Sequence, residues 1–306
     1  MTPYRFYAEV IIAKRKQKKM KALSIANIKI DGLLERLNMR RSSSVGVAFS
    51  GGGTRGFSHI GALLAFERFG IKPDIVAGVS AGSIAAVLYA AGLSPLEMRQ
   101  CFAEASNMAD FREWTVPKDG IFKLTKFGRI LESWLPVKNL EDLSIPCVVC
   151  ATNLDRGTQV AWAKGEISQR VVASCSIPIV FKPVVINGSH YVDGGVLHNL
   201  PAWAIRDYCD VLYGINCSPV NQNYQYKDSL IDVALRSYHL MAKANLIPDI
   251  RLCDYVITPR ELSTYKTFDL SALDQAIKIG YEATCRVLEA ALNNKNQSSR
   301  FIRKSK

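Results

Sequence analysis

The chain has 306 residues, 48% of them hydrophobic, and a formal net charge of +12 at pH 7. This size and apolar content suit one large α/β core, and no stretch of sequence resembles a membrane span or a secretory signal peptide. The eight cysteines are scattered through apolar segments, as reduced core cysteines are. We therefore expect a disulfide-free, cytoplasmic protein with one catalytic domain.

The positive charge is concentrated at the two ends of the chain. Residues 1–41 hold eleven Lys and Arg against three acidic residues, and residues 295–306 hold five against none. We expect a basic N-terminal arm (1–43) and a basic C-terminal tail (294–306) around a near-neutral catalytic domain (44–293). Such ends favour peripheral contact with an anionic membrane surface, or form merely solvated tails. No nucleic acid partner is expected, because no nucleic-acid-binding motif accompanies the charge.

A strand, a glycine loop and a helix open the expected domain. Residues 45–50 form an apolar run typical of a buried strand, and residues 57–69 have the apolar spacing of a helix. Between them stands Gly51-Gly52-Gly53-Thr54-Arg55-Gly56. A glycine loop in this place presents several backbone N–H groups beside the positive end of a helix, so we expect it to hold an anion.

The same loop matches the Gly-x-Gly-x-x-Gly pattern of dinucleotide-binding folds through Gly51, Gly53 and Gly56. That fold requires an acidic residue at the end of the second strand, about 20 residues further on. Asp74 lies at about the right distance but begins the second strand instead of ending it. A dinucleotide-binding oxidoreductase is therefore a competing hypothesis. A P-loop is excluded, because the sequence has no Gly-Lys-Ser/Thr here.

A candidate nucleophile follows the second expected strand, residues 73–78. Ser80 stands in Gly78-Val79-Ser80-Ala81-Gly82, and a run of strong helix formers continues to residue 91. Glycines on both sides permit the strained strand-to-helix turn that exposes a nucleophilic serine. The next helix begins with the capping box Ser94-Pro95-Leu96-Glu97. The alternative for this motif is a small-residue helix start packed in a core.

The rest of the chain continues the α/β pattern. Residues 94–134 are helical, irregular and rich in aromatic side chains that could cap an apolar pocket, and residues 218–228 read as an exposed loop. Cys147 and Cys150 have zinc or redox spacing, but they lie in an expected strand and point to opposite faces, so we interpret them as core. We expect further strands at 146–153, 159–163, 184–191, 211–216 and 255–258, and a final amphipathic helix at 271–292.

The candidate nucleophile needs a base, and the sequence offers two arrangements. A Ser-Asp-His order is met by Ser80 and Asp193 with either His198 or His239. Neither histidine is well placed, because His198 follows the acid by only five residues and His239 sits within a helical stretch. The other arrangement has Asp193 acting directly, in Asp193-Gly194-Gly195. By itself that tripeptide is also compatible with an ordinary turn.

Taken together, these blocks resemble the patatin-like phospholipase family over most of residues 45–292. The resemblance rests on the glycine loop, the turn from Gly78 to Gly82, and the block from Asp193 to Gly195. It rests also on the sequence from Ala173 to Pro183 and on Asn199-Leu200-Pro201. The resemblance implies a three-layer α/β/α fold with a mostly parallel central sheet, and hydrolysis of acyl esters, usually of phospholipids, lysophospholipids or neutral acyl lipids. We expect no cofactor and no metal site.

The resemblance also implies a Ser-Asp dyad, formed here by Ser80 and Asp193, without a catalytic histidine. In this hypothesis the N–H groups of Gly51, Gly52 and Gly53 form the oxyanion hole. Arg55 either steadies the glycine loop or meets an anionic headgroup, and the glycines Gly56, Gly78, Gly82, Gly194 and Gly195 support the motifs. The non-enzyme alternative is a peripheral membrane module that binds lipid and has a vestigial site.

Overall fold

The computed structural model describes residues 44–106, 124–225 and 229–304. The expected N-terminal arm lies outside the described residues, and so do residues 107–123, which form the middle of the aromatic-rich stretch. Within the described ranges, no helix is long and apolar enough to cross a membrane.

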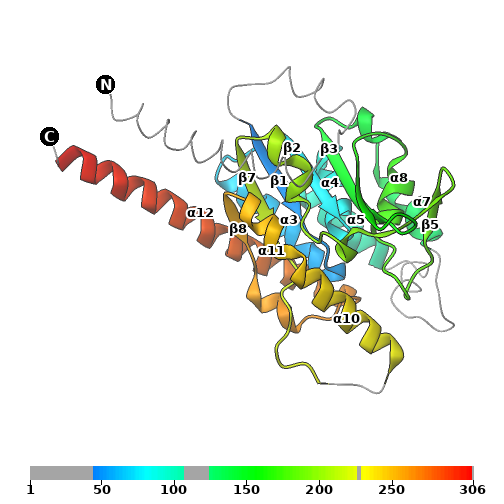
Figure 1. The fold of residues 1–306 in the computed structure, drawn as a ribbon. Helices are drawn as coiled ribbons and strands as arrows, with labels where there is room; N and C mark the ends of the chain where they lie inside the picture. Colours follow the sequence, from blue (N-terminus) through cyan, green and yellow to red (C-terminus); the bar gives the residue numbers. More distant parts are fainter. Residues whose placement is uncertain (1–43, 107–123, 226–228, 305–306) are drawn as a thin grey trace.

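One sheet of eight strands forms the centre of the molecule (Figure 1). Its order is β5-β6-β3-β2-β1-β7-β8, with β4 paired to β3 beside this path. Strands β3, β2, β1, β7 and β8 are parallel, whereas β4, β5 and β6 join by antiparallel pairing. Their bounds are β1 Val45–Phe49, β2 Ile75–Val79, β3 Cys147–Asn153, β4 Thr158–Trp162, β5 Val184–Ile186, β6 Ser189–Asp193, β7 Val211–Ile215 and β8 Tyr255–Ile257.

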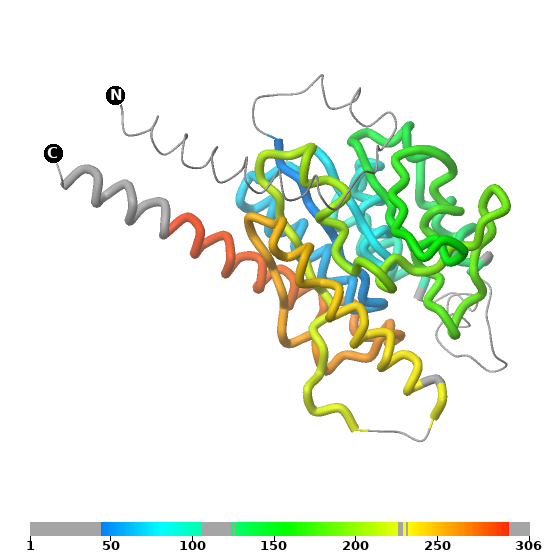
Figure 2. The backbone as a smooth tube through the Cα atoms, viewed as in Figure 1, coloured from blue at the N-terminus to red at the C-terminus, as the bar shows by residue number. Residues whose placement is uncertain are grey.

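The parallel strands are buried on both faces, which explains why they appear in the sequence as continuous apolar runs. Strand β1 lies in the middle of the sheet, between β2 and β7, as the blue segment of Figure 2 shows. Val47 and Phe49 belong to the core on one face, whereas Ala48 belongs to the core on the other. Cys147 and Cys150 divide in the same way between the two cores. Both are therefore core residues of β3, as predicted.

Helices cover both faces of the sheet and make the three layers of an α/β/α fold. The larger core includes side chains of α3, α4, α5, α7, α8 and α12, and the smaller core includes side chains of α9 and α11. The helix bounds are α3 Ser58–Arg68, α4 Ala81–Ala90, α5 Pro95–Ser106, α7 Thr125–Trp134, α8 Ile167–Ser174, α9 Ala202–Ile205, α10 Leu230–Ala244, α11 Leu246–Leu252 and α12 Leu273–Lys304. The layers and the mostly parallel sheet agree with the expected fold class. Helix α12 runs on beyond the 271–292 helix that the pattern predicts.

The prediction of one strand at 184–191 is wrong, because a hairpin occupies this region. Strand β5 ends at Ile186, β6 begins at Ser189, and the two strands pair antiparallel. The two turn residues Asn187 and Gly188 have φ angles of 49° and 77°. An Asn-Gly pair between two apolar runs is the usual sequence of such a tight turn. The hairpin carries Asp193 to the end of β6, beside β3.

Candidate active site

Ser80 stands on the turn between β2 and α4, as the sequence predicts. Its φ of 52° and ψ of −128° are a strained combination for a residue with a side chain. Gly78 and Gly82 permit this turn by close backbone contact: a Cβ at Gly82 would lie 2.2 Å from the Phe49 carbonyl oxygen, and one at Gly78 would lie 2.2 Å from the Gly82 carbonyl oxygen. Ser80 is buried apart from an exposed fraction of 5%.

A second serine fixes the turn from outside the motif. The Ser80 backbone N–H donates to Ser174 Oγ at 2.8 Å, and the Ser174 hydroxyl donates to the Cys150 carbonyl at 2.6 Å. Ser174 is the last residue of α8 and is fully buried. The strained peptide is therefore anchored to β3. The sequence analysis missed this role, because a single serine at a helix end carries no distinguishing pattern.

The register of the sheet brings Asp193 to Ser80. Val79, the last residue of β2, pairs with Cys150 on β3, and the next residue of β3, Ala151, pairs with Asp193 on β6. The residue that follows Val79 is Ser80, so the two side chains lie on either side of β3 at one edge of the sheet. Asp193 is completely buried.

The two oxygens of the Asp193 carboxylate have different surroundings. Oδ1 accepts hydrogen bonds from the Gly195 backbone N–H at 2.9 Å and from the Tyr238 hydroxyl at 2.8 Å. Oδ2 is buried and has no hydrogen-bond partner among the described residues. Burial raises the pKa of Asp193 to about 6, against the opposing effects of the Ser80 hydroxyl, the Gly195 N–H and the Tyr238 hydroxyl. No hydrogen bond joins the Ser80 hydroxyl to this carboxylate in the described structure.

Tyr238 is a member of the site that the sequence analysis missed. It projects from α10, is buried, and belongs to the larger core. Burial and the neighbouring Asp193 raise the pKa of its phenol well above the ordinary value, so the hydroxyl keeps its proton and donates to the carboxylate. Nothing in an amphipathic helix with apolar residues on one face distinguishes this tyrosine from a packing residue. Gly195 makes room for it: a Cβ there would lie 2.2 Å from the phenol oxygen.

The glycine loop follows β1 and leads into a short 3-10 helix, η1, at Gly53–Phe57. The Gly51 N–H donates to the Asn199 carbonyl at 3.1 Å, so this group is already occupied. The N–H groups of Gly52 and Gly53 donate to no acceptor within the described part of the chain. Of the three amides expected to hold an oxyanion, those of Gly52 and Gly53 are thus without an acceptor among the described residues. Gly53, with φ of 61°, packs against Thr267, whose carbonyl oxygen would lie 2.1 Å from a Cβ.

A small apolar cavity of about 20 Å³ adjoins the loop and the turn. Phe57, Ile84 and Phe102 line it, together with Ala81, the residue after Ser80. Its volume is that of about one water molecule, so a hydrocarbon chain enters only if these side chains move. Phe102 comes from the aromatic-rich stretch that the sequence suggested as a cap for an apolar pocket. Its ring packs edge to face against Trp134, with ring centroids 5.3 Å apart.

Comparisons with known proteins identify the family. The model of the family described as patatin-like phospholipase matches residues 47–205, which include the glycine loop, Ser80 and Asp193. The chain belongs to the patatin-like phospholipase family. Tyr238 and the whole of α10 lie beyond the matched residues.

Two curated relatives illustrate how this patatin-like chain compares with longer proteins. Lysophospholipase NTE1 of Lodderomyces elongisporus is 24% identical over 303 residues, covering 87% of this chain and 20% of the relative. Patatin-like phospholipase domain-containing protein 6 of Homo sapiens is 26% identical over 274 residues, covering 78% and 20%. The chain thus spans about a fifth of the length of these relatives. Among solved structures, VipD from Legionella pneumophila matches with a TM-score of 0.48 and 14% identity, over 81% of this chain and 67% of its own.

The four histidines of the patatin-like chain bind elsewhere. His198 contacts Asp249 at 2.7 Å, His59 contacts the Ser50 carbonyl at 2.9 Å, and His190 contacts Asp155 at 3.0 Å. His239 Nε2 lies 3.3 Å from both Arg55 and Thr267. In the described structure none of them hydrogen-bonds to Ser80 or Asp193. The Ser-Asp-His arrangement that the sequence left open has no geometric support.

The dinucleotide hypothesis also loses its acidic residue. Asp74 directly precedes β2, so it lies at the opposite end of that strand from Ser80. Its Oδ2 accepts the Val45 N–H at 2.8 Å, which ties together the starts of β1 and β2. Asp74 is therefore a structural residue, far along the strand from the glycine loop.

Arg55 holds the glycine loop in place. Its Nε donates to the Gly52 carbonyl at 3.1 Å, and its Nη2 donates to the Ser218 hydroxyl at 3.0 Å. Ser218 is buried, so this start of the expected exposed loop packs into the domain. Of the two roles left open for Arg55, the structure shows the first: the guanidinium joins the glycine loop to the segment after β7.

Gly56 and Gly194 serve close packing around the same centre. A Cβ at Gly56 would lie 2.7 Å from the Ala81 Cβ, and one at Gly194 would lie 2.9 Å from the Cys150 carbonyl oxygen. Both contacts bring the motifs against the Ser80 turn. No cluster of His, Cys, Asp or Glu that could hold a metal ion occurs among the residues the structure describes.

Proposed function

We propose that this protein is a hydrolase of lipid carboxylic esters that works through a dyad of Ser80 and Asp193. The observation that carries the proposal is a serine held in a strained turn beside a buried carboxylate whose Oδ2 has no hydrogen-bond partner among the described residues. A buried acceptor without a donor costs free energy, so its presence in a native structure points to a functional role. The Ser80 hydroxyl is a donor that could serve this acceptor during catalysis. Membership of the patatin-like family supports the same assignment.

In the first step Asp193 is the general base. With a pKa of about 6, its carboxylate is mostly ionised at neutral pH and still basic enough to accept a proton. The Ser80 hydroxyl transfers its proton to Oδ2 while Oγ attacks the acyl carbonyl. The developing oxyanion is held by the two free amides of Gly52 and Gly53, and each such donor contributes about 100- to 1,000-fold to the rate.

The second half of the cycle returns the proton. Protonated Asp193 donates to the departing alcohol oxygen as the ester bond breaks and an acyl-enzyme forms on Ser80. A water molecule then attacks the acyl-enzyme while Asp193 takes one of its protons, and Asp193 passes this proton to Ser80 Oγ as the acyl–oxygen bond breaks, so that the carboxylic acid leaves and both residues are regenerated. The acyl chain would extend towards the apolar cavity bounded by Phe57, Ile84 and Phe102, which must open to receive it.

The lipid nature of the substrate is inferred from the relatives, whose names describe a lysophospholipase and a phospholipase domain protein. We further infer that the basic ends of the chain hold the enzyme at an anionic membrane surface, where such substrates reside. The chain spans about a fifth of the length of those relatives, so both inferences are made for this chain and not for the whole relatives.

Labelling with a fluorophosphonate probe tests the nucleophile. The wild-type protein should be labelled, Ser80→Ala should not, and the exposed Ser133→Ala on α7 should be labelled like the wild type. Hydrolysis of a short-chain nitrophenyl ester should fall by about 1,000-fold or more in Ser80→Ala and by about 100-fold or more in Asp193→Asn. Full activity in either variant would rule out the dyad, whereas a wild-type protein that is neither labelled nor active would favour a lipid-binding module.

A further inference from the structure

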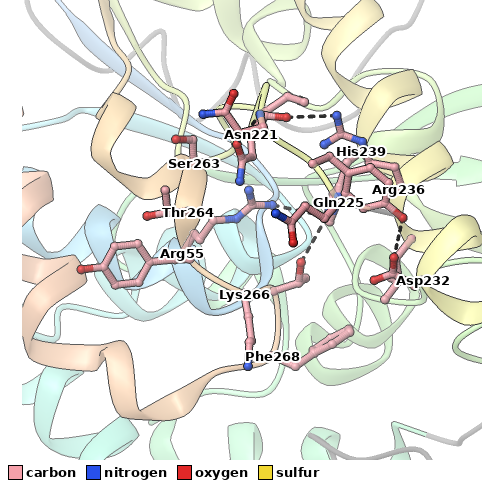
Figure 3. Close-up of a pocket in the computed structure, with 16 residues that line it drawn as sticks. Arg55, Asn221, Gln225, Asp232, Arg236, His239, Ser263, Thr264, Lys266 and Phe268 are labelled. Atoms are coloured by element: carbon pink, nitrogen blue, oxygen red, sulfur yellow. Dashed lines mark hydrogen bonds between the residues drawn. The ribbon is translucent and has the colours of Figure 1, made fainter. Parts of the chain in front are cut away.

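A second cavity, of about 460 Å³, lies between α10, the glycine loop and the segment that follows β8 (Figure 3). This volume is within the usual range for pockets that bind small ligands. Its charged lining consists of Arg55, Arg236 and Lys266, against the single carboxylate of Asp232. The cavity is therefore positively charged. It differs in this respect from the apolar cavity beside Ser80.

The two arginines have no carboxylate partner in the described structure. Arg55 is 5% exposed, and its donors contact the neutral oxygens of Gly52, Ser218 and Pro219. Arg236 donates to the Asn221 carbonyl at 3.0 Å and lies over the ring of Tyr224.

Asp232, the only carboxylate in the described lining, accepts a hydrogen bond from the Tyr224 hydroxyl. Burying the Arg55 guanidinium without a counter-charge costs free energy that a bound anion would recover.

His239 reports the sign of the local field. It lies on the cavity wall, and its pKa is lowered to about 3 by burial and by the charges of Arg55 and Arg236. The imidazole is therefore neutral at physiological pH. Arg55 Nη2 lies 3.3 Å from His239 Nε2, and Arg236 lines the same cavity.

The cavity shares a wall with the glycine loop. Arg55 binds the Gly52 carbonyl from the cavity side, and Thr267, another wall residue, packs against Gly53. Its backbone carbonyl also accepts the Thr54 N–H at 2.8 Å. A ligand in this cavity would thus lie beside the residues whose amides we assign to the oxyanion.

We propose that this cavity binds the phosphate group of a phosphate-bearing lipid whose ester lies at Ser80, with Arg236 as the residue that determines this specificity. Arginine is suited to phosphate because its planar donors can form two parallel charged hydrogen bonds. The proposal rests on the proposed function for the ester, but not for the binding of phosphate. Arg236 lies outside the part of the chain that the family model matches.

The first experiment measures binding of inorganic phosphate by calorimetry to the full chain, which does not depend on catalysis. Arg236→Gln should weaken binding by about 10- to 100-fold, as expected for one charged hydrogen-bonding group. Lys266→Gln, at the exposed rim, should weaken it less. Lys243→Gln removes the same charge from α10 away from the cavity, and should bind phosphate like the wild type. Equal binding in Arg236→Gln and wild type would overturn the site.

The second experiment compares two substrates that carry the same acyl chain, a lysophospholipid and a monoacylglycerol. The ratio of their kcat/KM values should fall by about 10- to 100-fold in Arg236→Gln and stay at the wild-type value in Lys243→Gln. If Arg236→Gln loses phosphate binding and keeps the ratio, the cavity takes free phosphate and its assignment to the substrate is wrong. If no ester is cleaved and Ser80 is not labelled, the proposed function fails while the calorimetry still decides the phosphate site.

Discussion

At the scale of single residues, the behaviour of Asp193 is decided by burial and by two donors. Burial raises its pKa, whereas the Gly195 N–H and the Tyr238 hydroxyl stabilise the charged form through Oδ1. Both donors bind the oxygen that does not face the proposed proton transfer. Oδ2 is left without a partner among the described residues, so the carboxylate can be oriented and still accept a proton.

The pH dependence of hydrolysis should follow from this carboxylate. Because only ionised Asp193 can act as a base, kcat/KM should be lost as the pH falls through about 6 and should level off above it. Tyr238→Phe removes a donor to the charged form, so it should move this limb upward by about one to two pH units. Tyr281→Phe, a hydroxyl loss on α12 at the surface, should leave the profile unchanged. An unmoved limb in Tyr238→Phe would exclude the coupling of these two groups.

At the scale of elements, the strand-turn-helix around Ser80 concentrates backbone strain in one residue. Its φ of 52° and ψ of −128° form a combination that costs a residue with a side chain about 1 to 3 kcal/mol. Hydrogen bonds from neighbouring elements hold it there, above all the one from the Ser80 N–H to Ser174. The turn is therefore imposed by its surroundings.

Relief of this strain should be measurable in the free energy of unfolding. Ser80→Gly should be more stable than Ser80→Ala by about 1 kcal/mol, since the relief exceeds the greater freedom of glycine in the unfolded chain. Ala81→Gly, one residue further on in α4, should instead destabilise the protein by up to about 1 kcal/mol. Urea denaturation of the three variants gives the comparison. A less stable Ser80→Gly would show that the turn is not strained.

Local sequence patterns predicted these elements where the signal lies within a few residues. The glycines two positions either side of Ser80 predicted the turn, and the Ser94 capping box is present, with the Ser94 N–H donating to Glu97 at 2.7 Å. The Asn187-Gly188 pair is an equally clear turn signal, but the apolar residues around it favour a single strand over 184–191. The occupied amide of Gly51 was not readable, because its acceptor, the Asn199 carbonyl, is distant in the sequence.

At the scale of the whole molecule, the candidate site depends on pairings between strands that are far apart in the chain. Ser80 and Asp193 follow or end the two strands, β2 and β6, that flank β3. The family resemblance implies a dyad of these two residues, but strand periodicity alone could not bring their strands together, since it gives the faces of a strand and not its neighbours. Neither the family resemblance nor the periodicity could predict the role of Tyr238, because α10 lies outside the shared motifs.

The basic N-terminal arm is a property of the whole chain, and its role can be tested in the intact protein. Replacing Lys14, Arg15, Lys16, Lys18 and Lys19 by Gln should weaken binding to phosphatidylserine-containing vesicles by about tenfold or more, given about 1 kcal/mol for each basic residue near the surface. Binding to phosphatidylcholine vesicles is the control. Added salt should weaken the wild-type binding, because it screens exposed charges. Binding that ignores both changes would contradict the role of the arm.

Helix α10 contributes to the candidate active site and to the positive cavity through residues only a few positions apart. Tyr238 donates to the proposed base, while Arg236 and His239 line the positive cavity. A rigid helix cannot shift one of these contacts without shifting the others. A ligand that moved Arg236 would therefore also act on the Tyr238 hydrogen bond to the carboxylate. Helix α10 would in this way let the enzyme couple recognition of a headgroup to the basicity of Asp193.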